Sequence, residues 1–233
     1  MGPRIILVIA SVETSLKELG TDCVDILYLH KPDRTTPFQE TLGAMDKLHK
    51  AGKFVRFGIS NFTAYEMAEV MMICKYNNWV RPSIFQGMYN CITRNIETEL
   101  FTACRRYGLD IVAYNPLAGG LFSGKIKSHD MVPERSVLGY QLSLTMIEAA
   151  LRWVVHHSEL KINDGNDGIL IGVSSVAQLD DNLTYLEKGP CRKKSSKLDE
   201  AWQISRADSP NYWHGDLDYG YDTIQALFGP GAQ

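Results

Sequence analysis

The sequence predicts an α/β fold of the (β/α)8 TIM-barrel type, and three observations lead to this prediction. Short apolar segments alternate with longer amphipathic segments at intervals of roughly 25 to 30 residues, which indicates βαβ crossovers and a parallel sheet. The short segments are almost continuously apolar, as strands covered on both faces are. Polar residues also stand at the end of each short segment, and a barrel collects such residues on one rim.

Five segments are the expected strands, namely 24–30, 55–60, 83–86, 110–115 and 168–173. The polar residues at their carboxyl ends are His30, Ser60 with Asn61, Gln86, Asn115, and Ser174 with Ser175. An open doubly wound sheet would concentrate such residues at one switch point, so a barrel fits better. Since a closed barrel of this type has eight strands, the barrel is predicted to be incomplete, with its first strands missing.

The segment "RIILVIA", residues 4–10, leaves two interpretations open. It is apolar enough to form a sixth strand. Joined to the following "SVETSLKELG", it equally fits the beginning of a helix.

Helix signals lie between the strands. In segment 36–53, apolar residues recur at helical spacing at Phe38, Leu42, Met45 and Leu48. Capping boxes are expected from Thr36 with Gln39 and from Thr63 with Glu66. Pro37 suits the first turn, and Gly52 and Gly108 suit helix ends. Further helices are expected near 143–157, 176–187 and 196–206.

The composition is that of a globular protein, with 45% apolar and 22% charged residues in 233, so a single domain over residues 1–233 is expected. The formal net charge of -3 includes no long basic block, so nucleic acid is not an expected partner. The five cysteines form no CxxC pair and no zinc-finger spacing, which gives no reason to expect a metal or a disulfide framework. No apolar run approaches the roughly 20 residues that a membrane span needs, so a cytoplasmic location is expected.

Five motifs then indicate a family. "VDILYLHKPD" (24–33), "GKFVRFGISNF" (52–62), "FQGMYN" (85–90), "YNPLAGGLFSGK" (114–125) and "ILIGVSSVAQLDDN" (169–182) resemble the aldo-keto reductases in order and spacing, most closely the aflatoxin-aldehyde-reductase branch with its fungal members. The resemblance covers about residues 11–125 and 143–213, and segments 1–10 and 126–142 are atypical. It implies an NADPH-dependent barrel that reduces aldehydes and ketones without a metal.

By this resemblance, His30 matches the histidine that orients the substrate. A neutral imidazole at a strand end can donate a hydrogen bond to a carbonyl oxygen and polarise it. The alternative is a histidine at the rim that only contacts neighbouring backbone. Ser60, Asn61 and Gln86 match the residues that hydrogen-bond the nicotinamide carboxamide.

The resemblance also implies a site for the rest of NADP(H). A glycine-rich loop lets backbone N–H groups approach phosphates, and Lys125 adds positive charge. The residues of this loop that match are Asn115, Pro116, Leu117, Ala118, Gly119, Gly120, Leu121, Ser123, Gly124 and Lys125. Ser174 and Ser175 are expected near the 2′-phosphate, or as a helix cap, and Gln178 and Asn182 near the adenine. His156 and His157 are adjacent on a helix and point apart, so a structural role is expected for them.

The chain departs from the family in one respect that bears on activity. The family's catalytic Asp, Tyr and Lys match no residue of this sequence, so the chain is expected to be N-terminally shortened. Tyr28 and Tyr89 are the tyrosines considered as substitutes, and period-2 alternation places Tyr28 on the same face as His30 but deeper in the barrel.

Three functions therefore remain open. The first is NADPH-dependent reduction of an aldehyde or ketone, on a fungal secondary metabolite. The second is a catalytically silent paralogue that binds NADP or a partner chain without turnover, and the third is an interaction module that binds no nucleotide. Strand edges left open by missing strands would favour pairing with another chain, such as a second copy in a homodimer.

Overall fold

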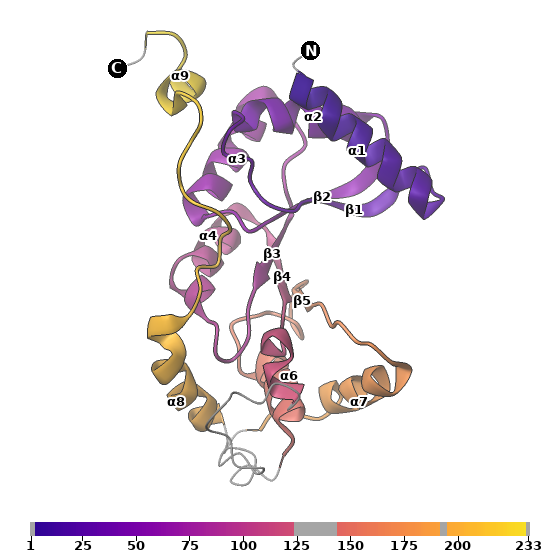
Figure 1. Ribbon diagram of the computed structural model, residues 1–233, viewed down its shortest axis with the longest axis vertical. Helices are drawn as coiled ribbons and strands as arrows, with labels where there is room; N and C mark the ends of the chain where they lie inside the picture. Colours follow the sequence, from indigo (N-terminus) through magenta and orange to yellow (C-terminus); the bar gives the residue numbers. More distant parts are fainter. Residues whose placement is uncertain (1–2, 124–143, 192–194, 232–233) are drawn as a thin grey trace. The chain divides into compact units, whose positions relative to one another are not determined.

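The computed structural model describes residues 3–123, 144–191 and 195–231 (Figure 1). The chain divides into two compact units. The first unit comprises Met1–Phe85, Ala103–Leu109 and Trp213–Gln233, and the second comprises Gln86–Thr102 and Asp110–Tyr212. The expectation of a single domain over residues 1–233 stays a prediction.

The described strands are β1 (Val24–Leu29), β2 (Phe54–Ser60), β3 (Ile84–Met88), β4 (Asp110–Tyr114) and β5 (Gly168–Ile169). They follow one another in sequence order in the sheet, and both β1 with β2 and β4 with β5 pair in parallel. The predicted α/β class with a parallel sheet is therefore confirmed, and the arrangement is consistent with an incomplete (β/α)8 barrel.

The β5 strand is shorter than the predicted segment 168–173. Leu170 N still donates to the carbonyl of Ala113, at 2.8 Å, but the residues after it leave the sheet. Those residues, from Ile171 to Ser174, line a cavity, and Leu170 lines it as well.

Residues 4–10 belong to helix α1 (Pro3–Leu19), so the helical interpretation of "RIILVIA" is confirmed and the sixth strand is wrong. Val12 and Leu16, one turn apart, are buried, and α1 packs against α2, as Figure 1 shows. This contact buries the apolar face of the helix.

Helix α2 (Phe38–Lys50) buries the four apolar residues predicted for its inner face, Phe38, Leu42, Met45 and Leu48. The predicted capping box of Thr36 and Gln39 is wrong, because Pro37 is the N-cap and no side chain caps the helix. Instead the Thr36 hydroxyl donates to the Asp33 carboxylate at 2.8 Å. Asp33 also accepts from Thr35 N and from the Thr35 hydroxyl. The Thr36 hydroxyl, which the capping box needed, is therefore bound in the turn before the helix.

Helix α3 (Ala64–Asn77) begins with the predicted capping box, which is confirmed. Glu66 N donates to the Thr63 hydroxyl at 3.2 Å, and Thr63 N donates to Glu66 Oε2 at 2.8 Å. Both side chains are buried, so this cap is part of the interior of the first unit.

Glu66 also accepts hydrogen bonds from two distant segments. Arg34 donates from Nε to Oε1 at 2.6 Å and from Nη2 to Oε2 at 2.9 Å, and the Tyr219 hydroxyl donates to Oε1 at 2.7 Å. Burial by itself would raise the pKa of the Glu66 carboxyl, but these donors and Thr63 N bring that pKa below its ordinary value.

The remaining helical elements include three that lie on the predicted segments 143–157, 176–187 and 196–206. Helix α4 (Leu100–Tyr107) follows a 3-10 turn, η1 (Asn95–Thr98), and ends at Gly108, whose φ is 74°. The others are η2 (Ala118–Ser123), α6 (Met146–His156), α7 (Val176–Leu186), α8 (Ser195–Ser205), η3 (Arg206–Asp208) and α9 (Thr223–Phe228).

The core of the second unit is aromatic. The Tyr89 ring lies edge-on to Trp153, with centroids 5.5 Å apart, and to Phe101, with centroids 5.2 Å apart. Both Tyr89 and Trp153 are fully buried, and Trp202 is also buried, as expected for tryptophans in helices. Among the described helices, none combines the length and the apolar character that crossing a membrane requires.

We predict that Glu66→Gln destabilises the chain at pH 7 by about 3 kcal/mol, because it leaves the buried Arg34 charge without its carboxylate. Since the folded pKa of Glu66 lies below its ordinary value of 4.5, this stabilisation is present above pH 4.5 and is lost as the pH falls through the folded pKa. Urea unfolding at a series of pH values measures both effects, and the difference from the unmodified chain should shrink in acid.

Glu69→Gln is the matched control. Burial, with the Glu66 charge nearby, raises the pKa of the Glu69 carboxyl. Ionisation of Glu69 is therefore less favourable in the folded chain than in the unfolded chain, and we expect this variant to be as stable as the unmodified chain or more so. Equal destabilisation by the two variants would contradict the assigned role of Glu66.

Candidate cofactor-binding site

In the first unit, three predicted site residues come together. His30 directly follows β1 and is exposed, and Ser60 and Asn61 lie at the end of β2 and are buried. Asn61 Nδ2 donates to the His30 carbonyl at 2.9 Å and to the Ser60 hydroxyl at 3.0 Å. The Asn61 amide thus holds the backbone of His30 in place.

The Tyr28 ring fills the space in which a side chain at position 58 would lie, and position 58 is a glycine. Tyr28 is opposite Gly58 in the register of β1 and β2, and a Cβ on Gly58 would come within 2.4 Å of the ring. Glycine at position 58 is required for this close approach. Tyr28 is therefore a packing residue of this strand pair.

In the second unit, a cavity of about 790 Å³ lies between the end of β4, the segment after β5, and α7. Eight predicted cofactor residues line it, namely Asn115, Pro116, Leu117, Gly119, Gly120, Ser174, Gln178 and Asn182. Ala118, Leu121, Ser123 and Ser175 belong to the same segments without being among its lining residues, and Gln86 lies within β3. Gly124, Lys125 and segment 126–142 are outside the described residues.

The loop after β4 is held by its own hydrogen bonds. Asn115 and Ala118 have φ values of 62° and 49°, and Gly119 and Gly120 are also left-handed. The Asn115 side-chain oxygen accepts from Gly119 N, and Ala118 N donates to the Asn115 carbonyl at 3.0 Å. Gly120 N donates to the Leu117 carbonyl at 3.1 Å. The loop is therefore preformed, and these N–H groups have acceptors within it.

Helix α7 begins at the cavity with a cap made by the predicted serines. Ser175 is the N-cap, and its hydroxyl accepts from Gln178 N at 3.3 Å. Ser174 donates from both its N–H and its hydroxyl to Gln178 Oε1, each at 3.0 Å. The helix-cap interpretation of Ser175 is confirmed, and its contact with a 2′-phosphate stays a prediction.

The cavity has two backbone features that suit an anion. It combines a tight left-handed loop with the amino terminus of an eleven-residue helix, where an anion is favoured. Its described lining has one acidic side chain, Asp181, and no Lys or Arg. Positive charge for the phosphates would have to come from outside this lining.

Tyr89, a predicted alternative proton donor, is part of a partly buried polar network. Its hydroxyl donates to Glu97 Oε1 at 2.5 Å and accepts from Glu159 N at 3.3 Å. Burial, with the Glu97 charge beside it, raises the pKa of the Tyr89 hydroxyl. A raised pKa makes Tyr89 a weaker acid, so the network favours a structural role.

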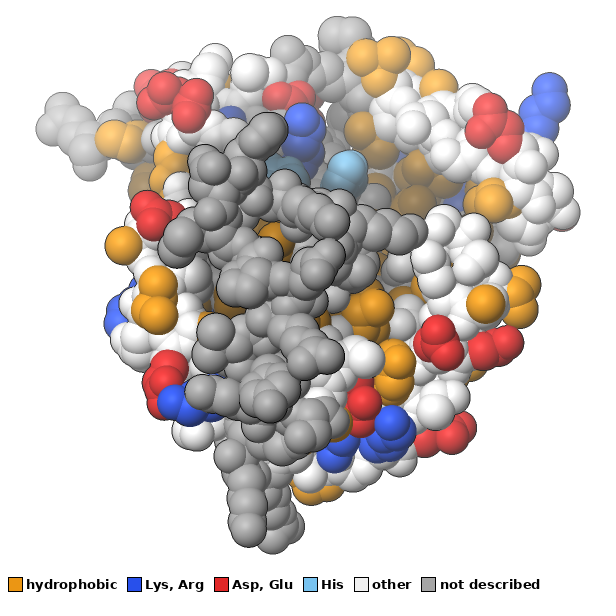
Figure 2. Space-filling model, turned by 60° about the horizontal axis from the view of Figure 1, so that its bottom comes forward, with side chains coloured by type: hydrophobic (Ala, Val, Ile, Leu, Met, Phe, Trp, Pro, Cys, Tyr) orange, Lys and Arg blue, Asp and Glu red, His pale blue; other side chains and the backbone are white. Residues whose placement is uncertain are grey.

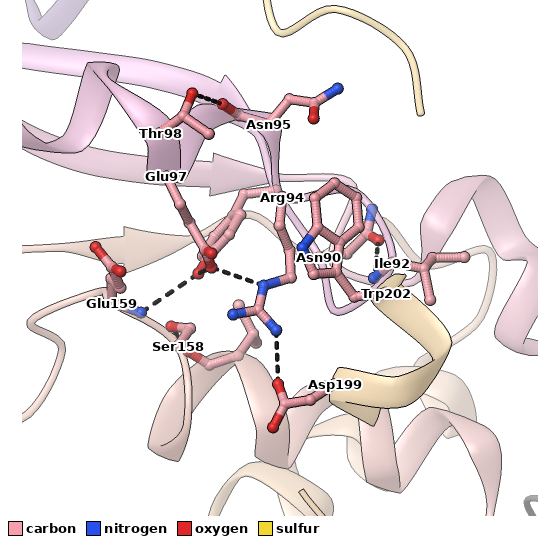
Figure 3. Close-up of polar contacts among 12 residues, drawn as sticks. Asn90, Ile92, Arg94, Asn95, Glu97, Thr98, Ser158, Glu159, Asp199 and Trp202 are labelled. Carbon is pink, nitrogen blue, oxygen red and sulfur yellow. Dashed lines mark hydrogen bonds and ion pairs between the residues drawn. The ribbon is translucent and has the colours of Figure 1, made fainter. Parts of the chain in front are cut away.

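Arg94 extends this network to helix α8. Figure 3 shows its guanidinium between Glu97 and Asp199, to which it donates at 2.9 Å and 2.7 Å. Arg94 also lies over the Trp153 ring, 4.9 Å from its centroid. This arrangement attaches α8 to the turn before η1.

The adjacent histidines serve structural roles, as predicted. His156 Nε2 contacts the Lys188 carbonyl at 2.8 Å, and His157 Nε2 accepts from Cys191 N at 3.0 Å. In the described parts of the chain, no three His, Cys, Asp or Glu side chains are placed to hold a metal ion together. On the face drawn in Figure 2, the described Lys and Arg side chains lie among Asp and Glu side chains.

The sequence reasoning missed two features. It did not identify Asp181, Ile147 and the apolar residues of 170–173 as cavity lining. It also missed the left-handed backbone of Asn61 and Asn115. Each asparagine comes directly after a strand, and this position was a usable signal, because Asn tolerates that conformation better than other residues with a side chain.

Comparison with known proteins agrees with the motifs. The family model described as "Aldo/keto reductase family" matches residues 7–203. The human protein "Aldo-keto reductase family 7 member A3" is 40% identical over 237 residues, which cover 87% of this chain and 71% of that protein. Human "Aflatoxin B1 aldehyde reductase member 2" is 39% identical over 88% of this chain and 66% of its own length. "Aldo-keto reductase pigE" of Monascus ruber is 34% identical over 92% and 67%.

We predict that Asn115→Ala is more destabilising than Asn115→Gly. Both variants lose the acceptor for Gly119 N, which is worth about 1 kcal/mol. Alanine must also adopt a φ of 62°, which costs roughly a further 1 kcal/mol, whereas glycine adopts it readily. Equilibrium urea unfolding distinguishes them, and equal stability of the two variants would show that the left-handed backbone imposes no strain.

Proposed function

This chain belongs to the aldo/keto reductase family, and we propose that it binds NADP(H) and reduces the carbonyl group of an aldehyde or ketone. The observation that carries the proposal is the cavity of the second unit, which gathers eight residues that the sequence assigned to the cofactor. The printed name of one relative, an aflatoxin B1 aldehyde reductase, supports an aldehyde as the substrate class.

In this proposal the second unit holds the phosphates and the adenine of the cofactor. The amino terminus of α7 and the loop of Asn115 to Gly120 contact the phosphates, and Lys125 supplies the positive charge that the described lining lacks. Gln178 and Asn182 contact the adenine. When bound, NADPH supplies a hydride.

The first unit acts on the carbonyl group. His30 donates a hydrogen bond to the carbonyl oxygen, and Asn61 fixes the His30 backbone through the bond to its carbonyl. The product alcohol also needs a proton. Its donor in this proposal is the His30 imidazole or water. With water as the donor, the rate would be roughly 10²- to 10⁴-fold lower than with a positioned general acid.

A second candidate function is binding of NADP(H) without turnover. The two tyrosines considered as substitutes support it. The Tyr28 ring packs over Gly58, and the Tyr89 hydroxyl is bound to Glu97.

We propose a cytoplasmic protein whose substrate is a carbonyl on a fungal secondary metabolite, and whose open strand edges pair two copies in a homodimer. Light scattering of the purified chain tests the dimer, and a monomeric mass at micromolar concentration would contradict it.

The decisive experiment is titration with NADPH, followed by a turnover assay with a panel of aldehydes. We expect saturable quenching of tryptophan fluorescence and slow NADPH oxidation. His30→Ala should retain the quenching and lose the oxidation, whereas the control His156→Ala, on α6, should retain both.

The outcomes separate the candidates. Quenching without oxidation by the unmodified chain would establish the second function and contradict the first. No binding in equilibrium dialysis would contradict both and would favour a module that binds no nucleotide.

A further inference from the structure

Residues 213–221, here called the C-terminal strap, lie beyond the segment that the family model matches, which ends at residue 203. The strap belongs to the first unit. It contacts the predicted nicotinamide residues directly, because His214 N donates to the Asn61 carbonyl at 3.3 Å. Asn61 in turn donates to the His30 carbonyl. One backbone hydrogen bond therefore connects the strap to the Asn61–His30 pair.

Arg34 attaches the strap at two points. Its Nη1 donates to the His214 carbonyl at 2.6 Å, and its own carbonyl accepts from Gly220 N at 2.8 Å. The approach is close, since a Cβ on Gly220 would lie 3.3 Å from the Thr35 Cα. The strap is thus fixed on both sides of the turn that contains Gly215.

Tyr219 provides the third attachment. Its hydroxyl donates to Glu66 Oε1 at 2.7 Å and lies 2.9 Å from the Tyr65 hydroxyl. Its ring packs edge-on to Phe38, with centroids 6.4 Å apart. Because Glu66 is fully buried, this hydrogen bond joins the strap to the interior of the unit.

Asn61 needs such support. Its φ of 62° is left-handed, a region that asparagine adopts more readily than other residues with a side chain but less readily than glycine. The His214 bond fixes the carbonyl of Asn61 from one side, while the His30 and Ser60 bonds fix the side chain from the other.

We propose that the C-terminal strap, held by Glu66 and Arg34, positions the Asn61–His30 pair and thereby sets the affinity for the nicotinamide end of NADP(H). The inference rests on the proposed function. It makes Tyr219 and Glu66 positioning residues, which act through Asn61 and do not themselves contact the cofactor.

The test compares two ligands by isothermal titration calorimetry. NADPH carries the nicotinamide, whereas adenosine 2′,5′-bisphosphate carries only the part assigned to the second unit. Tyr219→Phe removes the hydroxyl and keeps the ring, so we expect NADPH affinity to fall roughly five- to tenfold, the change that a loss of about 1 kcal/mol produces. Affinity for the bisphosphate should stay unchanged.

Tyr65→Phe is the matched control. It removes the exposed partner of Tyr219 and leaves the bond to Glu66 intact, so NADPH affinity should change by less than about twofold. Hydrogen exchange should increase at residues 57–62 and 213–221 in Tyr219→Phe, and much less in the control.

Unchanged NADPH affinity in Tyr219→Phe would overturn the proposal. An equal loss for both ligands would also overturn it, since a general loss of folding affects both. If the unmodified chain binds neither ligand, the proposed function fails and this inference with it. If the unmodified chain binds both and the variant behaves identically, only the inference fails.

Discussion

The first unit depends on one buried carboxylate. Glu66 receives four hydrogen bonds on its two oxygens, from the loop after β1, from the start of α3 and from the C-terminal strap. Removing any one donor leaves the buried carboxylate charge with one hydrogen bond fewer and with no water to replace it. The loss of stability is therefore larger than the free energy of the bond alone. Segments separated by more than 150 residues in sequence are therefore expected to unfold together.

The second unit uses a different principle at its cavity. Its loop after β4 satisfies several of its own N–H groups, so a bound phosphate would exchange protein acceptors for its own oxygens. Such an exchange contributes less net affinity than binding to unpaired donors would. Because the described lining also carries the acidic Asp181, the start of α7 is the described feature that most favours a phosphate in the proposed complex.

The periodicity of apolar residues was sufficient to predict the elements that bury one regular apolar face. The strands β1 to β4 and the helices α2, α3 and α6 lie close to their predicted segments, because their apolar spacing and the Thr63 cap are local signals. The Thr36 cap failed because Asp33, outside the four-residue pattern, competes for the same hydroxyl. The end of β5 failed because its apolar residues line a cavity, and apolar character alone does not separate a strand from a lining.

The site was predictable to the extent that its residues stand in motifs. The motifs located His30, Asn61 and the cavity residues, but no local signal connects Arg34 or Glu66 to Tyr219, since their contact depends on tertiary structure. The same holds for Arg94, whose partner Asp199 lies 105 residues away.

The Tyr28 ring over Gly58 constrains the order in which substitutions at these two positions can be made. A side chain at position 58 is tolerated only after position 28 has lost its ring, because the two groups would occupy the same volume. The two positions are therefore epistatic, and the substitution that removes the Tyr28 ring must come first. Any evolutionary or laboratory route that introduces a larger residue at position 58 passes through a variant of Tyr28, and the reverse order leads through a chain that folds poorly.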